Sequence, residues 1–424
     1  MCQINELFSF IKNAPSAYHT VAEVKKELIA CGHTELFEGE KWELCNGGSY
    51  FVIRNGSSII AFKARKSARG FMIVASHSDS PAFRLKITPE ICGVYNRLEV
   101  EKYGGMIYYS WFDRPLSLAG RVAVRTKDGI ETKLVNIDRD VAVIPSVAIH
   151  MNRTVNEGYK FNPAQDLLPL VGSSESNGAV IKEVAKAAGV SENDILSHDI
   201  FLYNRENGKI FGVQNEYILS PRLDDLECVF TSLKAYINAK DSSSVPVLAV
   251  FDNEEVGSET KQGAASTFLY DVLSRVGGED YSTMISNSFM VSADNAHAKH
   301  PNHPELADRD NAPVMNGGIV VKWNANQKYT TDGVSDATFR TICERVGVKT
   351  QSYYNRADMA GGSTLGSISN TKVSIPTIDI GLAQLAMHSA SETAGAYDVA
   401  AMIAALTEFF ETSIKRNGEK IIFS

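Results

Sequence analysis

The sequence predicts an α/β protein with a mixed, mostly parallel central sheet flanked by helices, and a second, β-rich domain inserted into it. Three observations favour this fold: short apolar runs typical of buried strands, amphipathic segments between them typical of helices, and a change to alternating patterns in the middle of the chain. With 424 residues, of which 44% are hydrophobic, the chain is long enough for a large core and two domains.

Four apolar runs are the predicted strands of the central sheet. They are FMIVAS at 71–76, VPVLAVF at 245–251, SFMVSA at 288–293 and VSIPTIDI at 373–380. Strands buried on both faces read as nearly continuous hydrophobic runs, as these do. Each run is closely followed by a histidine, an aspartate or a glutamate.

Probable crossover helices lie between and after these runs. Apolar residues recur at helical spacing in RLDDLECVFTSLKAYINA from Arg222, in SDATFRTICERVG from Ser335 and in AYDVAAMIAALTEFFETSIKR from Ala396. Strands that alternate with helices indicate a largely parallel sheet covered on both faces.

The middle of the chain has a different pattern. RLEVEKY and RVAVRTKDGIETKLVNI alternate between apolar and polar residues, and Asp128-Gly129 is typical of a hairpin turn between two strands. We therefore expect an inserted β-rich domain at residues 85–216, within a main domain formed by residues 1–84 and 217–424.

Composition excludes several classes of function. The formal net charge is −8, and no run of Lys or Arg exceeds two residues, which argues against a nucleic-acid surface or a polybasic membrane contact. The six cysteines form no Cys-x-x-Cys pair, so neither a disulfide framework nor a thiolate zinc site is indicated. With neither a signal sequence nor a membrane-spanning stretch in evidence, we expect a cytoplasmic protein.

Seven ionisable residues follow the predicted strands or begin the next helix. Because open α/β sheets place their ligand crevice at the carboxyl ends of the strands, we expect them to converge. Two imidazoles and several carboxylates suit two divalent ions of the zinc, manganese or cobalt kind, about 3.5–4 Å apart with a shared carboxylate, as in a hydrolase. The residues are His77, Asp79, Asp224, Glu254, Glu255, Asp294 and His388.

The adjacent Glu254 and Glu255 suggest a division of labour. In an extended segment consecutive side chains point to opposite sides, so one can bind metal while the other faces the substrate. Taken singly, each of the seven residues has a structural alternative, because a histidine after a strand can be a satisfied core residue and a carboxylate there can cap a helix.

The motifs that carry these residues resemble those of the M18 metallopeptidases, the aspartyl aminopeptidase family. SHSDSP, SPRLDDL, DNEEVGSE, SADNAHAKHPNH, GGSTLG and LAMHS occur in the family's order and span essentially the whole chain. SWFDRPLSLAGRV and IPSVAIHMNRTVNEG are similar to the family's inserted dimerisation domain. The resemblance therefore implies a zinc-peptidase-like fold.

The resemblance also implies roles for individual residues. It makes Asp224 the bridging ligand of two metal ions, with zinc the first expectation and cobalt or manganese possible. His77 and Asp294 would complete one ion's ligands, Glu255 and His388 the other's, and Glu254 would be the general base. Asp79 would orient His77.

Outside the metal ligands, the resemblance suggests substrate contacts. Gly362 and Ser363, in GGSTLG, would lie near the substrate, and His150 would reach the active site of a neighbouring subunit. Family members assemble as dimers or tetrahedral dodecamers, so we expect a homo-oligomer that acts on peptides. His297, His300 and His303 are spaced like ligands on a helix, but Pro301 and Pro304 break that helix, and we exclude them as metal ligands.

Three positions depart from the family pattern: Asp225 where Asn is common, Ser367 where Pro is common, and Ser391 where Arg is frequent. Ser391 removes one possible cation for an acidic substrate; Lys322, Lys328 and Arg356 are candidate replacements. We therefore expect a dinuclear aminopeptidase that prefers N-terminal Asp or Glu. Alternatives are a Leu-type preference, a related carboxypeptidase or deacylase, and a catalytically silent, particle-forming scaffold.

Overall fold

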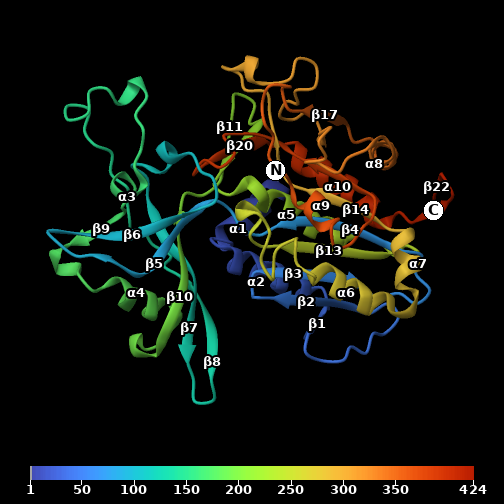
Figure 1. The fold of residues 1–424 in the computed structure, drawn as a ribbon, viewed down its shortest axis with the longest axis horizontal. Coiled ribbons are helices and arrows are strands. Elements are labelled where there is room, and N and C mark those ends of the chain that lie inside the picture. Colours follow the sequence, from blue (N-terminus) through green and yellow to red (C-terminus); the bar gives the residue numbers. More distant parts are fainter. Residues whose placement is uncertain (1) are drawn as a thin grey trace.

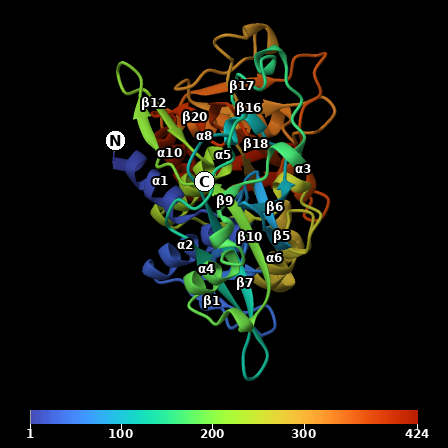
Figure 2. The same ribbon diagram turned by 90° about the vertical axis from the view of Figure 1, so that its left-hand side faces the viewer.

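The computed structural model describes residues 2–424, which form two lobes (Figure 1). The larger lobe contains the main sheet, and the other projects from it and lies in front in Figure 2. Within the described residues the main sheet has nine strands, in the order β1 (Thr34–Leu36), β2 (Ser49–Arg54), β3 (Ser58–Lys63), β13 (Val245–Phe251), β4 (Phe71–His77), β14 (Phe289–Ala293), β18 (Thr377–Gly381), β16 (Ile319–Trp323) and β17 (Thr350–Tyr354).

The centre of the main sheet is parallel. Strands β13, β4, β14 and β18 run in one direction, whereas β2–β3, β3–β13 and β18–β16 pair antiparallel. The predicted mixed, mostly parallel α/β fold is therefore confirmed, and all four predicted strands are present. Strand β18 begins later than predicted because the Val373 N–H donates to the Ser369 carbonyl, at the end of helix α9, instead of joining the sheet.

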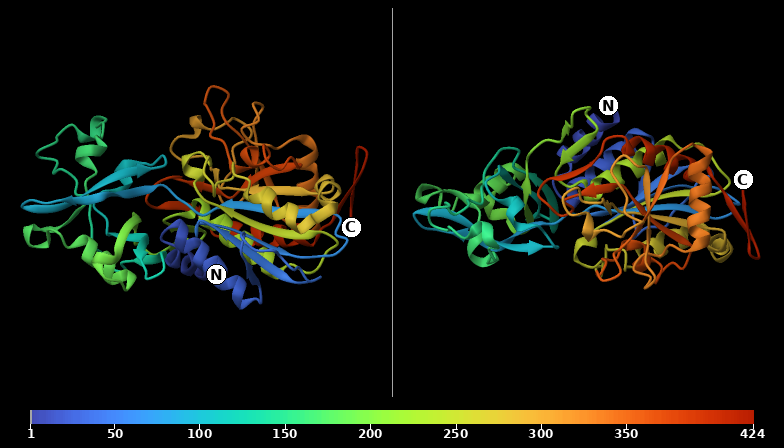
Figure 3. Two further views of the ribbon diagram at one scale, coloured as in Figure 1. Left: turned by 60° about the horizontal axis from the view of Figure 1, so that its bottom comes forward. Right: turned by 90° about the horizontal axis from the view of Figure 1, so that it is seen from above.

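Helices cover both faces of the main sheet (Figure 3). Its central strands are apolar on both faces: in β4, Met72 and Val74 pack into one core and Phe71, Ile73 and Ala75 into the other. The first core includes α1 (Cys2–Asn13), α2 (Ala17–Ala30), α5 (Leu223–Asn238), α8 (Gly333–Arg345) and α10 (Asp398–Glu411), and the second α6 (Phe268–Gly277), α7 (Tyr281–Ser286) and α9 (Leu365–Ser369).

The last helix is shorter than predicted. We expected one helix to run from Ala396 through residue 416, but α10 ends at Glu411 and the chain continues into a hairpin of β21 (Ile414–Asn417) and β22 (Lys420–Phe423). The Ser413 and Ser424 backbones bond to each other across this hairpin, so strand pairing replaces the helical pattern there.

The smaller lobe is built on an antiparallel sheet, the insert sheet, with its own hydrophobic core. The predicted hairpin is confirmed: the Thr126 N–H donates to the Gly129 carbonyl over 2.9 Å, between β7 and β8. Helices α3 (Pro163–Asp166) and α4 (Val180–Ala188) belong to this lobe (Figure 1). The insert-sheet order is β8 (Ile130–Asn136), β7 (Leu116–Arg125), β10 (Ile195–Asn204), β5 (Ala82–Ile91), β6 (Tyr95–Tyr103) and β9 (Leu170–Ser173).

A third sheet joins the end of the insertion to the main lobe. Strand β11 pairs with β12 and not with the insert sheet. The order is β11 (Lys209–Phe211), β12 (Tyr217–Ser220), β20 (Glu392–Gly395), β19 (Ala383–Leu385) and β15 (Ala296–His297). None of the described helices has the length and apolar character needed to cross a bilayer.

The centre of the main sheet should be the most sensitive part of the fold. Leu248, 1% exposed, lies on β13 between Ala61 and Val74. We expect Leu248→Ala to lower the free energy of unfolding by about 2–5 kcal/mol, because the substitution leaves a cavity in packed surroundings. Denaturant titration measures the change.

Val334→Ala, at a position in α8 that is 55% exposed, is the matched control and should change stability by about 0.5 kcal/mol or less. Equal effects of the two substitutions would contradict the assigned core.

Candidate metal centre

Five of the seven predicted site residues lie at or just after the carboxyl ends of main-sheet strands, whereas Asp224 and His388 follow β12 and β19 of the third sheet. Strand β4 ends at His77, which pairs with Phe251 at the end of β13. Strand β14 ends one residue before Asp294. Because β13, β4 and β14 are parallel, their carboxyl ends bring His77, the Glu254–Glu255 segment and Asp294 to one edge.

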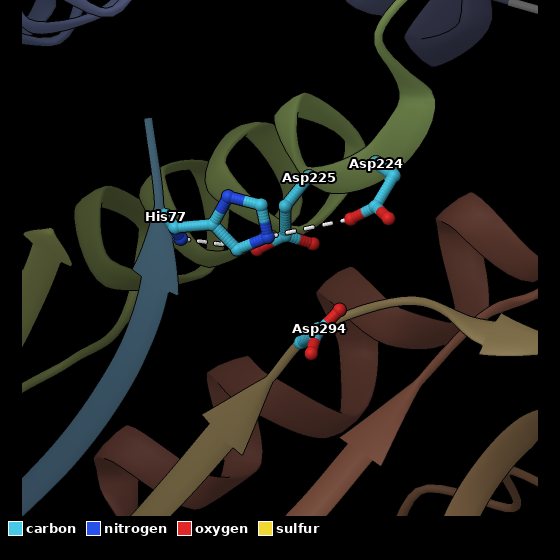
Figure 4. A group of neighbouring side chains, drawn as sticks. All are labelled: His77, Asp224, Asp225 and Asp294. Carbon is cyan, nitrogen blue, oxygen red and sulfur yellow. Dashed lines mark hydrogen bonds and ion pairs between the residues drawn. The ribbon is translucent and has the colours of Figure 1, made fainter. Parts of the chain in front are cut away.

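One group of ligand atoms lies between β4, β14 and the start of α5 (Figure 4). His77, Asp224, Asp225 and Asp294 each offer an atom, and these atoms lie within 4.8 Å of one another. His77 Nε2 is 3.3 Å from Asp224 Oδ1. Asp224 is at the start of α5 but has non-helical backbone angles, so its side chain does not follow the helix surface.

A second group shares Asp224 with the first. Asp224, Glu255 and His388 also offer atoms within 4.8 Å of one another. His388 Nε2 lies 3.3 Å from both Asp224 Oδ2 and Glu255 Oε2. The two oxygens of Asp224 therefore face two different histidines, which is the arrangement expected of a carboxylate shared by two ions.

Asp225 was not predicted as a ligand, yet it belongs to the first group. Its Oδ2 accepts the His77 backbone N–H over 3.1 Å, and its Oδ1 has no hydrogen-bond partner among the described residues. Burial raises the pKa of Asp225 well above its ordinary value, against the opposing charge of His77.

The carboxylates of the two ligand groups are buried, and few positively charged side chains lie beside them to balance their charge. Asp224, Glu255 and Asp294 have buried side chains, and Lys322, 3.3 Å from Asp294 Oδ2, is the lysine paired with them in the described part of the chain. A buried carboxylate is costly unless it is paired or binds metal. Carboxylate oxygens and neutral imidazoles are the donors that zinc and related ions take, so these residues fit divalent ions.

Asp79 holds both sides of the site together. Its Oδ1 lies 3.4 Å from His77 Nδ1 and accepts the Glu254 backbone N–H, while its Oδ2 accepts the Glu255 backbone N–H. The carboxylate thus orients the imidazole and also fixes the segment with the two glutamates. The role of Asp79 in orienting a metal-bound His77 stays a prediction; the contacts with Glu254 and Glu255 were not predicted.

The predicted extended backbone at Glu254 and Glu255 is wrong. Asn253 has φ +63°, and Glu254–Val256 form a short 3-10 turn. The two side chains nevertheless separate as predicted, because Glu255 joins the second ligand group and Glu254 lines a cavity. Burial and the charges of Asp294 and Asp79 raise the pKa of Glu254 to about 8, against the opposing charge of His77.

The cavity beside Glu254 measures about 190 Å³ and is also lined by Asp224, Asp294 and His388. Gly362 and Ser363 form part of its wall, and their contact with a substrate stays a prediction. A larger cavity of about 470 Å³ lies between the insert sheet and the N-terminal helices, but Asp79 is the one predicted site residue on its wall within the described chain. The smaller cavity is therefore the candidate substrate site.

The structure separates His150 from the metal ligands of its own chain. His150 is exposed on the loop between β8 and α3, in the projecting lobe. His303 is exposed and His300 is partly exposed, and His297, which is also exposed, lines the 190 Å³ cavity without joining either ligand group.

Glu392 is a supporting residue that the sequence reasoning missed. Its two oxygens accept the backbone N–H groups of Asp224 and His388, over 3.0 and 2.7 Å. It therefore fixes the backbone of two ligands at once. A lone glutamate in the small apolar segment ASETAGA is the signal that could have identified it.

Comparisons with known proteins identify the family. The family model for aminopeptidase I zinc metalloprotease (M18) matches residues 10–410. The chain belongs to the M18 aminopeptidase family. A probable M18 family aminopeptidase 2 of Clostridium acetobutylicum is 46% identical over 422 residues, covering 96% of this chain and 98% of the relative. The Pseudomonas aeruginosa PAO1 protein of the same name is 38% identical over 419 residues, covering 96% and 97%.

Solved structures of M18 aminopeptidases share the fold. Ape4, in a complex with Nbr1, has a TM-score of 0.93 and 35% identity, over 97% of this chain and 85% of that one. The mApe1 dodecamer of S. cerevisiae has a TM-score of 0.85 and 28% identity, over 96% of each chain. Family membership makes this chain a metalloaminopeptidase, and the buried His and Asp groups are where it could bind metal.

The raised carboxyl pKa values predict how the metal-free M18 protein responds to pH. The folded chain holds the Glu254 proton up to a pH near 8, whereas the ordinary pKa is 4.5, so stability is lost as the pH rises through this interval. His77 and His388 act in the same direction because their carboxylate neighbours outweigh burial and raise their pKa values. Asp224 titrates below this interval.

After chelation we therefore expect a lower melting temperature at pH 8 than at pH 5.5, and a larger stabilisation by added zinc at pH 8. Calorimetry with and without zinc measures both. A melting temperature of the chelated protein that rises with pH would contradict the expectation.

Proposed function

We propose that this M18 aminopeptidase uses two divalent metal ions and removes acidic residues, Asp or Glu, from the N termini of peptides. The observation that carries the proposal is the position of Asp224, whose two carboxylate oxygens face His77 and His388 in two overlapping ligand groups. In the order implied by the family resemblance, His77 and Asp294 serve one ion and Glu255 and His388 the other. Zinc is the first expectation, with cobalt or manganese as alternatives.

The chemistry divides between the ions and the side chains. Two bound divalent ions would polarise the scissile carbonyl and lower the pKa of a water molecule at the site. Glu254, beside the ligands on the cavity wall, accepts a proton from the attacking water and later donates it to the leaving amine. Asp79 keeps Glu254 in place through the Glu254 backbone N–H and keeps the His77 ring oriented.

Lys322 supports the acidic preference. Of the three candidate cations, it alone lines the 190 Å³ cavity within the described residues. Lys328 is exposed, and Arg356 forms an ion pair with Asp358. Lys322 also binds Asp294 and the Asn295 carbonyl, so it is held rigidly beside the ligands. A fixed ammonium group favours a carboxylate side chain in the cavity.

Exposed apolar side chains support assembly into a homo-oligomer, a dimer that assembles further into a dodecamer. Val147, Ile149 and Met151 are exposed on the loop that carries His150, and Met151 is 85% exposed. Such a cluster is typical of a subunit interface, and it agrees with a His150 that reaches a neighbouring subunit's site. The solved mApe1 dodecamer favours the same assembly.

Unpaired thiols support a cytoplasmic location. The described chain includes the exposed free cysteines Cys2, Cys31, Cys45 and Cys92. Exposed thiols persist in the reducing cytoplasm and tend to oxidise outside it.

Replacing the proposed general base tests the mechanism. Glu254→Gln should lower kcat by about 10²- to 10⁴-fold, because the amide cannot accept the proton. The variant should still bind two equivalents of zinc, since Glu254 is outside both ligand groups. Steady-state hydrolysis of aminoacyl anilides and calorimetric zinc titration measure the two properties.

Glu259→Gln, at an exposed position in the same segment, is the matched control and should retain full activity. Full activity in Glu254→Gln would refute the role of Glu254. A single zinc equivalent in wild-type protein would refute the dinuclear centre.

A substrate panel tests the preference. Wild-type protein should cleave Asp and Glu substrates better than Leu or Lys substrates and should not cleave N-acetylated ones. Lys322→Met should lower kcat/KM for Asp and Glu by roughly 10- to 100-fold, since a charge-assisted hydrogen bond is worth about 1.5–3 kcal/mol, and should spare Leu. Lys328→Met is the control.

Cleavage of Leu alone would replace the acidic preference by a Leu-type one. If Lys322→Met lowered kcat/KM equally for all substrates, Lys322 would act by holding Asp294 in place and would not determine the substrate preference. Cleavage of acetylated substrates would favour a deacylase, release of C-terminal residues a carboxypeptidase, and no cleavage at all the particle-forming scaffold.

A further inference from the structure

The segment from Tyr103, the last residue of β6, to Ile107 connects the insert sheet to the candidate metal centre. Tyr103, at the end of β6, donates its phenolic O–H to Asp79 Oδ2 over 2.6 Å. The same hydroxyl oxygen accepts a hydrogen bond from Asn253 Nδ2 over 2.7 Å. The Tyr103 ring is held edge-on against Phe201 of β10, with 5.5 Å between ring centroids. The hydroxyl is therefore fixed by packing within the insertion.

The carboxylate that Tyr103 contacts is the one on which both ligand groups depend. Asp79 Oδ1 lies near His77 of the first group, and Asp79 Oδ2 accepts the N–H of Glu255 from the second. Tyr103 shares Oδ2 with Glu255, so the phenol sets the direction in which the carboxylate faces this backbone. A change in the angle of one carboxylate would move His77 and Glu255 together.

Two further contacts place the same segment against the second ligand group. Gly104 has φ +75°, and a Cβ atom built there would lie 3.2 Å from Glu255 Cβ, which is closer than ordinary packing allows. The Ile107 N–H donates to the His388 carbonyl over 3.1 Å. The segment from Tyr103 to Ile107 therefore contacts Glu255 and His388 of the second ligand group, and Tyr103 lines the 470 Å³ cavity and not the 190 Å³ one.

We propose that Tyr103 is a positioning residue of the metal centre: through Asp79 it fixes the geometry of His77 and Glu255, so that the inserted domain completes the metal site of its own chain. The inference rests on the dinuclear site proposed above and adds a role for the insertion that is independent of a second subunit. Partners that hydrogen-bond to the groups orienting a metal ligand commonly alter metal affinity by about 10- to 100-fold.

Tyr103→Phe tests the proposal because it removes the hydroxyl and keeps the ring that packs on Phe201. Metal-free protein is titrated with cobalt(II) alone, in competition with a chelating indicator, and the visible absorption of the bound cobalt is recorded. We expect cobalt affinity about 10- to 100-fold weaker and a changed cobalt spectrum. At saturating cobalt, kcat for aminoacyl substrates should fall while KM stays unchanged.

Tyr203→Phe is the matched control. Its hydroxyl donates to Asn136 Oδ1 over 2.8 Å, between strands of the insert sheet, with no contact to Asp79. The control loses one hydroxyl hydrogen bond of similar length from the same domain, so it should retain wild-type cobalt affinity and spectrum. A purely structural role for Tyr103 would give the two variants the same result.

Gly104→Ala provides a second, independent test. The substitution removes no hydrogen bond, and its added methyl group would lie too close to Glu255 Cβ. It should also weaken cobalt binding, and melting curves verify that each variant is folded. Wild-type affinity and spectrum in folded Tyr103→Phe would overturn the inference while leaving the metal site in place. If Tyr103→Phe did not fold, wild-type cobalt binding by Gly104→Ala would overturn it. Wild-type protein that binds no cobalt would overturn the metal site and the inference together.

Discussion

The site depends on one carboxylate held between two imidazoles. Asp224 Oδ1 and Oδ2 each lie 3.3 Å from a histidine nitrogen, and those histidines arrive from distant parts of the chain. Burial alone would raise the pKa of Asp224, but the hydrogen bonds from His388 and His77 hold it well below its usual range. An ionised carboxylate is thus kept at a position that is only 3% exposed, and this charge must be matched by cations.

The surrounding polar contacts keep that charge cluster in one geometry. Asp79 and Glu392 do not belong to either ligand group; each instead binds backbone N–H groups of segments that carry ligands. Backbone anchoring leaves the ligand side chains free for metal. Burial, together with repulsion from neighbouring carboxylates, raises the pKa values of Glu254 and Glu255, and this is the cost of the arrangement.

One part of the inserted domain contacts residues of the candidate metal centre, and another part is exposed. Through Tyr103 it contacts Asp79, and through Gly104 it lies against Glu255 of the second ligand group, whereas His150 is exposed on a loop of the same lobe. One part of the insertion therefore lies against the candidate metal centre, and another part lies on the surface. Strands β6, which ends at Tyr103, and β8, which precedes the loop with His150, belong to the same insert sheet (Figure 1).

The sequence by itself determined the fold class, the central strands and the ionisable residues that follow them. Strands such as β4 and β13 were predictable because burial on both faces requires an unbroken apolar run, which is a local property.

The tertiary structure decided which side chains support the ligands. Tyr103 lies 24 positions from Asp79, and Glu392 lies 168 positions from Asp224, so no local pattern connects them. It also decided the turn at Glu254 and the end of α10, where backbone hydrogen bonds and strand pairing overrode the local preference. Local patterns record which residues are buried, whereas hydrogen bonds between distant segments exist only once the chain has folded.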